Sequence, residues 1–256
     1  MELDRYRALK EGRLSPEMIL EWSGGEVTKP MTMNMDTNRT FAGGLFDEEI
    51  FGRMEDWENP ENASKMGHIE LMWPTIPELA MQKEDTRLGR YLDMSSEDLY
   101  AIAHYQARVL LDPEDNGDPS LAYGKVFTNL EYLEYLGDHD KGPGETATGP
   151  TAIRELIQDK KLLDHNIDEP DPEWMLVKII PVIPAWERPM LPIGDGKWAV
   201  SDLNDVYRKI IRHNRRMRRL IEMNEKPYVW VRDALAVQKA CDQLFEMLDQ
   251  RYRKIS

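Results

Sequence analysis

The sequence has a single cysteine, no long apolar run and a deficit of basic residues, and each shortage excludes a class of protein. Cys241 alone forms neither an intramolecular disulfide nor a zinc site of four cysteines. No stretch reaches the roughly 18 apolar residues of a membrane-spanning helix, and residues 1–13 lack the apolar core of a secretory signal. We therefore expect a soluble, folded chain that stays in a cytoplasm, with Cys241 as a small core residue of a helix.

The balance of charge is acidic, with 33 lysines and arginines against 47 aspartates and glutamates and a net charge of −14. A protein that binds DNA by itself needs clustered cations to neutralise phosphates, and an acidic surface repels the duplex. This argues against a free-standing nucleic-acid-binding protein. Basic residues are nevertheless concentrated between Arg208 and Arg219, whereas residues 112–175 are strongly acidic. Any contact with nucleic acid is thus expected to be local.

Mixed short patterns in the first 190 residues predict an α+β fold with small sheets and helices. Ser15 and Pro16 are typical of a helix start, and Gly24-Gly25 is expected to end that helix. The remaining predicted elements follow in chain order: loops and small strands over 27–52, a surface loop over 53–65, a strand over 66–74, a capped helix and strand over 95–111, a short helix over 129–136 and a helix over 151–163.

Two apolar stripes in the last quarter of the chain predict a long antiparallel helical hairpin, with a turn containing Pro227. Asp202 is expected to cap the first helix, and Asn214 at its seam is expected to cost stability while fixing the register. The residues that recur at spacings of three and four are Leu203, Tyr207, Ile210, Asn214, Met217 and Ile221, then Ala234, Val237, Cys241, Leu244 and Leu248.

Single residues and clusters that resemble chemical sites have plainer interpretations. His68 has no partner histidine or cysteine at ligand spacing and is expected to be packed or hydrogen-bonded. Gly194, Asp195 and Gly196 lack the longer pattern of a phosphate-binding loop and indicate a turn. A calcium-binding loop is only partly matched by the acidic residues Asp112, Glu114, Asp115 and Asp118. We expect them to lie in a solvated loop.

Five motifs in the same order as in a known family carry a resemblance to it. They are SPEMILEWSGGEVTKPMTMN at 15–34, GGLFDEEIFG at 43–52, MGHIELMWP at 66–74 followed by RLGRYLDM at 87–94, GPTAIRELI at 149–157 and PEWMLVKIIPVIP at 172–184. Together with the hairpin they resemble the N-terminal clamp region of the largest catalytic subunit of multisubunit RNA polymerase, beta-prime in bacteria. The resemblance covers nearly the whole chain.

The resemblance implies a division of the chain into four regions. Residues 1–188 correspond to the clamp head and core, 189–202 to the lid loop beside the RNA–DNA hybrid, 203–248 to the clamp helices and 249–256 to the start of the rudder loop. In the lid, Lys197 and Trp198 have a composition suited to phosphate contact and base stacking, although Trp198 is equally compatible with burial against the clamp.

In the clamp helices the resemblance implies contact with DNA or with the promoter-specificity factor. His213 aligns with an arginine that the family uses to hold sigma, so we expect a standard bacterial sigma to bind poorly. A solvated helix face is the alternative for this basic cluster. The candidate contact residues are Arg208, Arg212, His213, Arg215, Arg216 and Arg219.

Departures from the family pattern shape the expected assembly. Between Phe51 and Met66 bacterial relatives carry a zinc ribbon, which this chain replaces with RMEDWENPENASK, so no zinc is expected. The family's magnesium-binding motif NADFDGD is absent, and Mg²⁺ is expected in a separate C-terminal beta-prime fragment. The pattern is most similar to the split beta-prime subunit of giant, phiKZ-like phages. A shortened ordinary bacterial subunit, the alternative, leaves the missing ribbon unexplained.

We therefore expect a non-catalytic N-terminal beta-prime-like subunit of a DNA-directed RNA polymerase, a nucleotidyltransferase complex. Its expected partners are the C-terminal beta-prime fragment, two beta-like halves, a promoter-specificity subunit, template DNA and the RNA–DNA hybrid, with no membrane. The expected location is the cytoplasm of an infected bacterium or the virion. Two alternatives remain: a clamp mimic that sequesters a host initiation factor, which has no use for a lid, and a free-standing nucleic-acid-binding module, which the charge of −14 disfavours.

Overall fold

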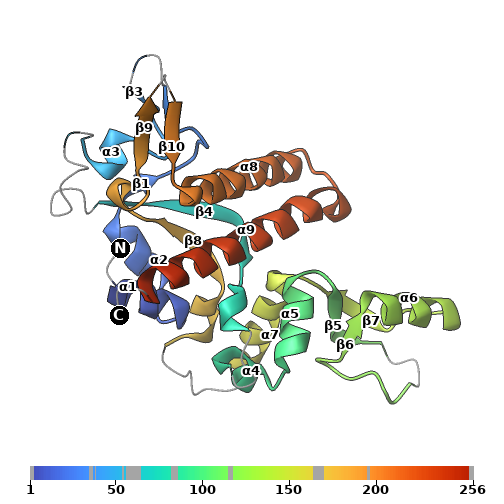
Figure 1. Ribbon diagram of the computed structural model, residues 1–256. Coiled ribbons are helices and arrows are strands. Elements are labelled where there is room, and N and C mark those ends of the chain that lie inside the picture. Colours follow the sequence, from blue (N-terminus) through green and yellow to red (C-terminus); the bar gives the residue numbers. More distant parts are fainter. Residues whose placement is uncertain are drawn as a thin grey trace. The chain divides into compact units, whose positions relative to one another are not determined.

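The fold is a mixture of helices and small sheets, which confirms the predicted α+β class (Figure 1). A computed structural model describes residues 3–34, 37, 39–53, 55, 65–81, 86–114, 118–163, 170–194 and 197–253. The chain divides into two compact units. Unit 1 comprises Met1–Met72 and Val177–Ser256, and unit 2 comprises Trp73–Leu176. The predicted head and core segment, 1–188, has residues in both units, and its role stays a prediction.

Unit 1 is built around a three-stranded sheet of order β1-β4-β8, in which β1 runs parallel to β4. Strand β4 crosses the boundary between the units after Met72. The elements of unit 1 are α1 (Leu3–Lys10), α2 (Pro16–Trp22), β1 (Ser23–Glu26), β2 (Met33–Asn34), β3 (Arg39–Thr40), α3 (Glu48–Phe51), β4 (Met66–Thr75), β8 (Val177–Val182), the 3-10 turn η4 (Ala185–Glu187), β9 (Met190–Gly194), β10 (Lys197–Val200), α8 (Asp202–Glu222) and α9 (Pro227–Arg253).

The predicted start of the first motif helix is confirmed, whereas its predicted end is wrong. Ser15 caps α2 by accepting a hydrogen bond from the Met18 amide at 3.3 Å, with Pro16 as the first helical residue. The helix ends at Trp22, and the glycine pair lies in β1 instead. A side chain at Gly24 would lie 2.3 Å from the Ile50 carbonyl oxygen. The glycine therefore serves the close approach of α3 to β1 and not a helix end.

Unit 2 has an antiparallel sheet of order β6-β5-β7, packed against helices. Its apolar core joins Leu99 and Ile102 from α5 to Ile153 and Ile157 from α7, with Val109 from β5. The strand and helices predicted for this region are confirmed. The elements are η2 (Glu78–Ala80), α4 (Arg87–Leu92), α5 (Ser96–Ala103), β5 (Ala107–Pro113), β6 (Val126–Thr128), α6 (Asn129–Asp138), β7 (Gly144–Ala147), α7 (Pro150–Leu163) and η3 (Pro172–Met175).

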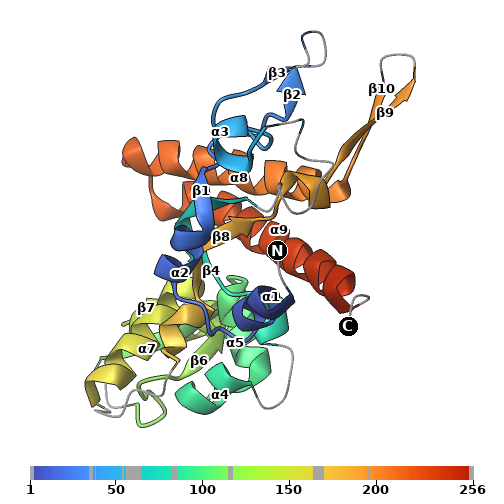
Figure 2. The same cartoon turned by 90° about the vertical axis from the view of Figure 1, so that its left-hand side faces the viewer.

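The predicted helical hairpin is present as α8 and α9, which run side by side in Figures 1 and 2. Pro227 is the first residue of α9, and Asn224 makes the turn in the left-handed region with φ 56°. Every predicted seam residue is buried except Ile221, which is partly exposed. The predicted cap was wrong by one position, because Ser201 is the N-cap and Asp202 begins the helix.

Helix α9 continues through Arg253, beyond the predicted end of the hairpin at 248. The reason is packing against α1. Tyr6 donates its hydroxyl to Asp249 at 3.1 Å and stacks on Tyr252, with ring centroids 5.0 Å apart. Lys10 also pairs with Asp249. Cys241 is a buried core residue of α9, as predicted. Among the helices described, none has the length and apolarity that crossing a bilayer requires.

Candidate nucleic-acid interface

The predicted arginines of α8 lie on the side of the helix opposite its buried seam. At 3.6 residues per turn, positions 208, 212, 215, 216 and 219 share one face, whereas the seam residues share the other. The outermost members, Arg212, Arg215 and Arg219, are exposed to solvent. We call these three residues the arginine face. It extends over about 10 Å along the helix, at a rise of 1.5 Å per residue.

The other predicted contact residues are engaged within unit 1. Arg208 is half-buried, pairs with Asp205 at 2.6 Å and donates to the Thr32 hydroxyl at 3.1 Å. His213 and Arg216 both reach Asp233 on α9, at 2.9 and 3.3 Å. The Arg216 side chain is still 69% exposed, so it can add its charge to the arginine face. His213 instead links α8 to α9, and Arg208 links α8 to Thr32 outside the hairpin.

Asp233 is a buried carboxylate, with 4% of its side chain exposed, and explains why His213 points inward. Burying a carboxylate is costly unless hydrogen bonds and opposite charge compensate it. His213 supplies the hydrogen bond from α8 and Arg216 supplies the charge. His213, which the resemblance predicts at a sigma-contacting position, is thus engaged by Asp233 of its own hairpin.

Asn214 fixes α8 to the central sheet of unit 1, a role that sequence reasoning missed. Its side-chain amide donates to the Glu70 carbonyl at 2.8 Å, and its oxygen accepts from the Met72 amide at 2.7 Å. One side chain thus satisfies a donor and an acceptor on β4. Asn214 was predicted to fix the register of the helical hairpin, and the predicted partner was wrong. Its polarity serves the strand and not the α8–α9 seam.

Arg188 fixes the base of the same helix, and it is fully buried. Its guanidinium donates to the Ile183 carbonyl and to Asn204, each at 2.8 Å. It also stacks over Phe46 and Phe51, 4.8 and 4.6 Å from the ring centroids. Burial lowers the pKa of Arg188 to about 10, so the side chain remains charged at neutral pH. Cation–π contacts compensate for part of the lost hydration.

The predicted lid residues form a two-stranded ribbon, β9 with β10, seen at the side in Figure 2. Gly194 pairs with Lys197 and has φ +93°, a left-handed conformation that favours glycine and supports the predicted turn. Leu191 and Ile193, on one face of β9, are 57% and 64% exposed. Asp195 and Gly196 lie outside the described residues, as do the side chains of Lys197 and Trp198, so both interpretations of Trp198 remain.

The described residues that resemble chemical sites in the sequence behave as ordinary surface and packing residues. His68 shares a hydrogen bond of 2.7 Å with the Ser23 hydroxyl, as expected of a packed histidine, and burial lowers its pKa. Asp118 accepts a bond from the Ser120 amide, and Glu114 pairs with Lys141. Asp115 lies outside the described part. Across the described ranges there is no group of three or more metal-ligating side chains.

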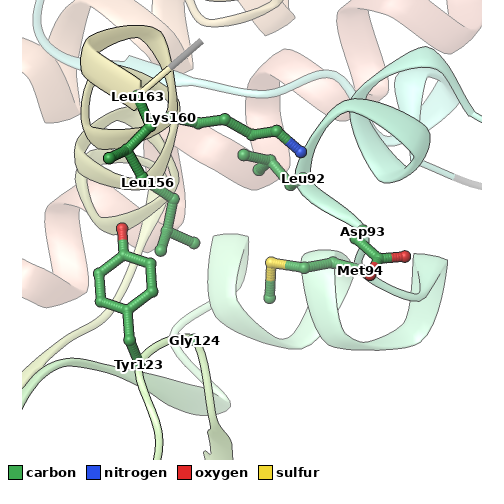
Figure 3. A pocket seen from close by; sticks show the side chains of 8 residues that line it. All are labelled: Leu92, Asp93, Met94, Tyr123, Gly124, Leu156, Lys160 and Leu163. Carbon is green, nitrogen blue, oxygen red and sulfur yellow. The ribbon is translucent and has the colours of Figure 1, made fainter.

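Unit 2 contains a cavity of about 540 Å³, lined mainly by apolar side chains (Figure 3). Tyr123 lies at its edge and donates its hydroxyl to Asp159 at 2.8 Å, and burial together with that carboxylate raises the pKa of Tyr123. Lys160 extends across the cavity toward Leu92 in Figure 3 and lies over the Tyr91 ring.

Comparison with known proteins gives one family and many relatives. The family described as "RNA polymerase Rpb1, domain 1" matches residues 5–165 and 151–256. A DNA-directed RNA polymerase subunit beta' of Thermoanaerobacter sp. is 31% identical over 299 residues, covering 96% of this chain and 25% of the relative. The same subunit of Streptococcus pneumoniae (strain Hungary19A-6) is 30% identical over 300 residues, covering 96% and 24%. The chain thus spans about a quarter of the length of these relatives.

Proposed function

This chain belongs to the family described as RNA polymerase Rpb1, domain 1, and from that premise we propose that it is the clamp-forming, N-terminal beta-prime-like part of a DNA-directed RNA polymerase. In this role unit 1 holds the template DNA and the RNA–DNA hybrid, and the α8–α9 hairpin docks a promoter-specificity subunit. The chain contributes no catalytic metal ligand. Mg²⁺ and the nucleotidyl-transfer chemistry belong to the C-terminal beta-prime part and the beta-like subunits.

The observation that carries the proposal is the arginine face of α8. Arg212, Arg215 and Arg219 are exposed and point away from the packed seam. Their span of about 10 Å matches roughly three phosphates along one DNA strand, at 3.4 Å per step. Guanidinium groups suit phosphate oxygens because their fixed donors reach two oxygens at once. Helix α8 presents these arginines, and Asn214 and Arg188 fix this helix to the rest of unit 1.

The β9–β10 ribbon supports the proposed lid. Leu191 and Ile193 expose apolar surface on one face of a narrow, two-stranded element. Apolar side chains exposed together on one face favour contact with another surface. The exposed end of a stacked RNA–DNA hybrid offers a flat, weakly polar surface of that kind. A ribbon of this chemistry is suited to keep RNA and template strands apart after they separate.

The test is a reversal of charge in the assembled polymerase. We expect Arg212→Glu/Arg215→Glu/Arg219→Glu to weaken DNA binding strongly and to reduce the slope of log K against log salt by about 2 to 3. The matched control, Lys226→Glu/Arg232→Glu/Lys239→Glu, makes the same change of charge at exposed positions of the turn and α9. Unchanged DNA affinity and unchanged promoter use in the arginine variant would overturn the proposal. Loss of the specificity subunit with an unchanged salt slope would reassign the face to a protein contact.

A clamp mimic that sequesters an initiation factor is the second candidate, because an arginine face also suits an acidic helix of a protein. The β9–β10 ribbon counts against it, since such a mimic has no hybrid to separate. Native mass spectrometry of the complex that co-purifies with this chain distinguishes the two. Stoichiometric beta-like subunits and a chain carrying NADFDGD support the polymerase and the split arrangement. Recovery with a sigma factor alone supports the mimic.

A further inference from the structure

Helix α6 of unit 2 presents an apolar outer face that no described residue covers. Leu130 and Leu133 are 67% and 64% exposed. Gly137 lies on the same face, one turn further along, and a side chain added there would meet nothing within 4 Å. The spacing of three and four residues is that of a helix surface that receives another helix. We call these three residues the leucine face.

The opposite side of α6 explains why the helix is stable with its leucines outside. Tyr135 is buried and meets Phe127 edge-on, with ring centroids 6.0 Å apart, and Tyr132 packs beside it. Thr128 and Glu131 form a capping box at the start of the helix. The sheet and the cap therefore hold α6 without help from Leu130 or Leu133. Burial within unit 2 does not account for the leucines.

The charged side chains that α6 itself carries are all acidic. Glu131, Glu134 and Asp138 are exposed along one flank of the leucine face. Unit 2 as a whole has 22 acidic and 9 basic residues, a net charge of −13. A surface of this sign repels DNA and RNA, and it repels a second copy of itself. It attracts an apolar partner that carries lysine or arginine beside its apolar residues.

We propose that the leucine face docks an amphipathic, basic helix of another protein. The partner's apolar side chains lie over Leu130 and Leu133, and its backbone approaches α6 closely at Gly137. Lysines or arginines of the partner meet Glu134 and Asp138. The surface uses no residue of α8 or of the β9–β10 ribbon, so the inference stands apart from the proposed function.

A titration with defined peptides tests the chemistry on the full chain. The probe is a synthetic helix of leucine and lysine at helical spacing, and its control replaces every leucine with serine. We expect the leucine peptide to bind at least 10-fold more tightly, and Leu130→Ser/Leu133→Ser to remove that advantage. Leu162→Ser/Leu163→Ser is the matched control, because these leucines of α7 are 77% and 83% exposed in the same unit. Equal binding of the two peptides would show attraction by charge alone and overturn the proposal.

Photo-crosslinking in the natural complex identifies the occupant. A photoreactive phenylalanine replaces Leu133 in one preparation and Leu162 in the other, and crosslinked peptides are sequenced by mass spectrometry. We expect position 133 to capture a protein segment with apolar residues at spacings of three and four and an excess of lysine and arginine. Crosslinks to nucleic acid, to a second copy of this chain or to nothing above the position-162 control would each overturn the proposal.

Discussion

The two units of this protein use charge in opposite ways. Among the described residues, the buried charged side chains all belong to unit 1: Asp47, Glu187, Arg188, Asp233 and Asp249. The buried polar residues of unit 2 are Thr75, Thr86 and His104, and each of its described charged residues keeps part of its surface in solvent. Unit 1 thus accommodates buried charges with hydrogen bonds, aromatic rings and opposite charges, whereas unit 2 has an apolar core beneath a mainly acidic surface.

The net charge of the whole chain is distributed unequally between the two units. Unit 2 carries −13 of the −14, and the 25 acidic and 24 basic residues of unit 1 leave it at −1. The unit that presents the arginine face is therefore nearly neutral. A whole-chain charge is a poor guide to nucleic-acid contact when the units differ this much, because screening confines electrostatic effects to about 10 Å at 0.1 M salt.

The strongest test of the contrast removes the most buried charge of unit 1. We expect Arg188→Ala to lower the free energy of unfolding of unit 1 by about 3 to 5 kcal/mol, because it leaves a cavity and unpairs Asn204 and the Ile183 carbonyl. Unit 2 should not change. Hydrogen exchange resolved by peptide, over a urea series, follows each unit separately.

Two further variants make the Arg188 result specific. Arg188→Lys keeps the charge but loses the planar fork, so it should destabilise unit 1 by less than alanine does. Arg13→Ala, at a side chain that is 52% exposed, should change stability by less than about 0.5 kcal/mol. Equal loss of protection in peptides of unit 1 and unit 2 after Arg188→Ala would contradict the expectation that the effect stays within unit 1.

Arg188 and Asn214 also mark where sequence reasoning ends. The stripes of α8 and α9 were predictable because helix periodicity is local, and Ser15 with Pro16 announced α2 in two residues. The aromatic partners of Arg188 are Phe46 and Phe51, and the partners of Asn214 are Glu70 and Met72. No spacing rule connects residues more than 130 positions apart. A buried arginine and a surface arginine look alike until the fold brings the rings together.

The candidate site shows the same limit on a smaller scale. Six positions on α8 were predicted as contacts from composition and resemblance, and helical spacing alone places five of them on one face. Their availability depended on neighbours that spacing does not reveal. Thr32 engages Arg208, and Asp233 engages His213 and Arg216. On α6 the helix was predicted, but the outward direction of Leu130 and Leu133 required knowing which side meets the sheet.

Salt gives the second test, of intermediate size. Raising NaCl from 0.05 to 0.5 M should stabilise unit 2 by about 1 kcal/mol, because screening weakens repulsion among its surface carboxylates. Unit 1 should respond less, and the exposed pair of Arg253 with Asp249 should weaken. Hydrogen exchange of α7 and α9 peptides reports the two responses in one sample. A larger gain in α9 than in α7 would reverse the comparison.

Acidification gives the smallest effect but separates the units by sign. Burial lowers the pKa of His68 in unit 1, although Glu26 and Glu70 oppose the shift. The unfolded chain, with an ordinary histidine pKa of about 6.5, then binds the proton more readily than the folded chain. Stability from this residue is present above that value and is lost as the pH falls through it toward the lowered pKa. Unit 1 should lose stability between pH 7 and 5.

Glu155 in unit 2 has the opposite sign. Burial raises its pKa, and Glu145 adds to the shift while Arg154 opposes it. The folded chain therefore binds the proton first, and unit 2 gains stability as the pH falls from the raised pKa toward the unfolded value of about 4.3. Each effect should stay below about 1 kcal/mol, because both side chains are partly exposed and solvent screens them. His68→Gln should flatten the profile of unit 1 alone, and Glu155→Gln that of unit 2 alone. If the stability of both units changed in the same direction as the pH falls, the response would not come from His68 and Glu155.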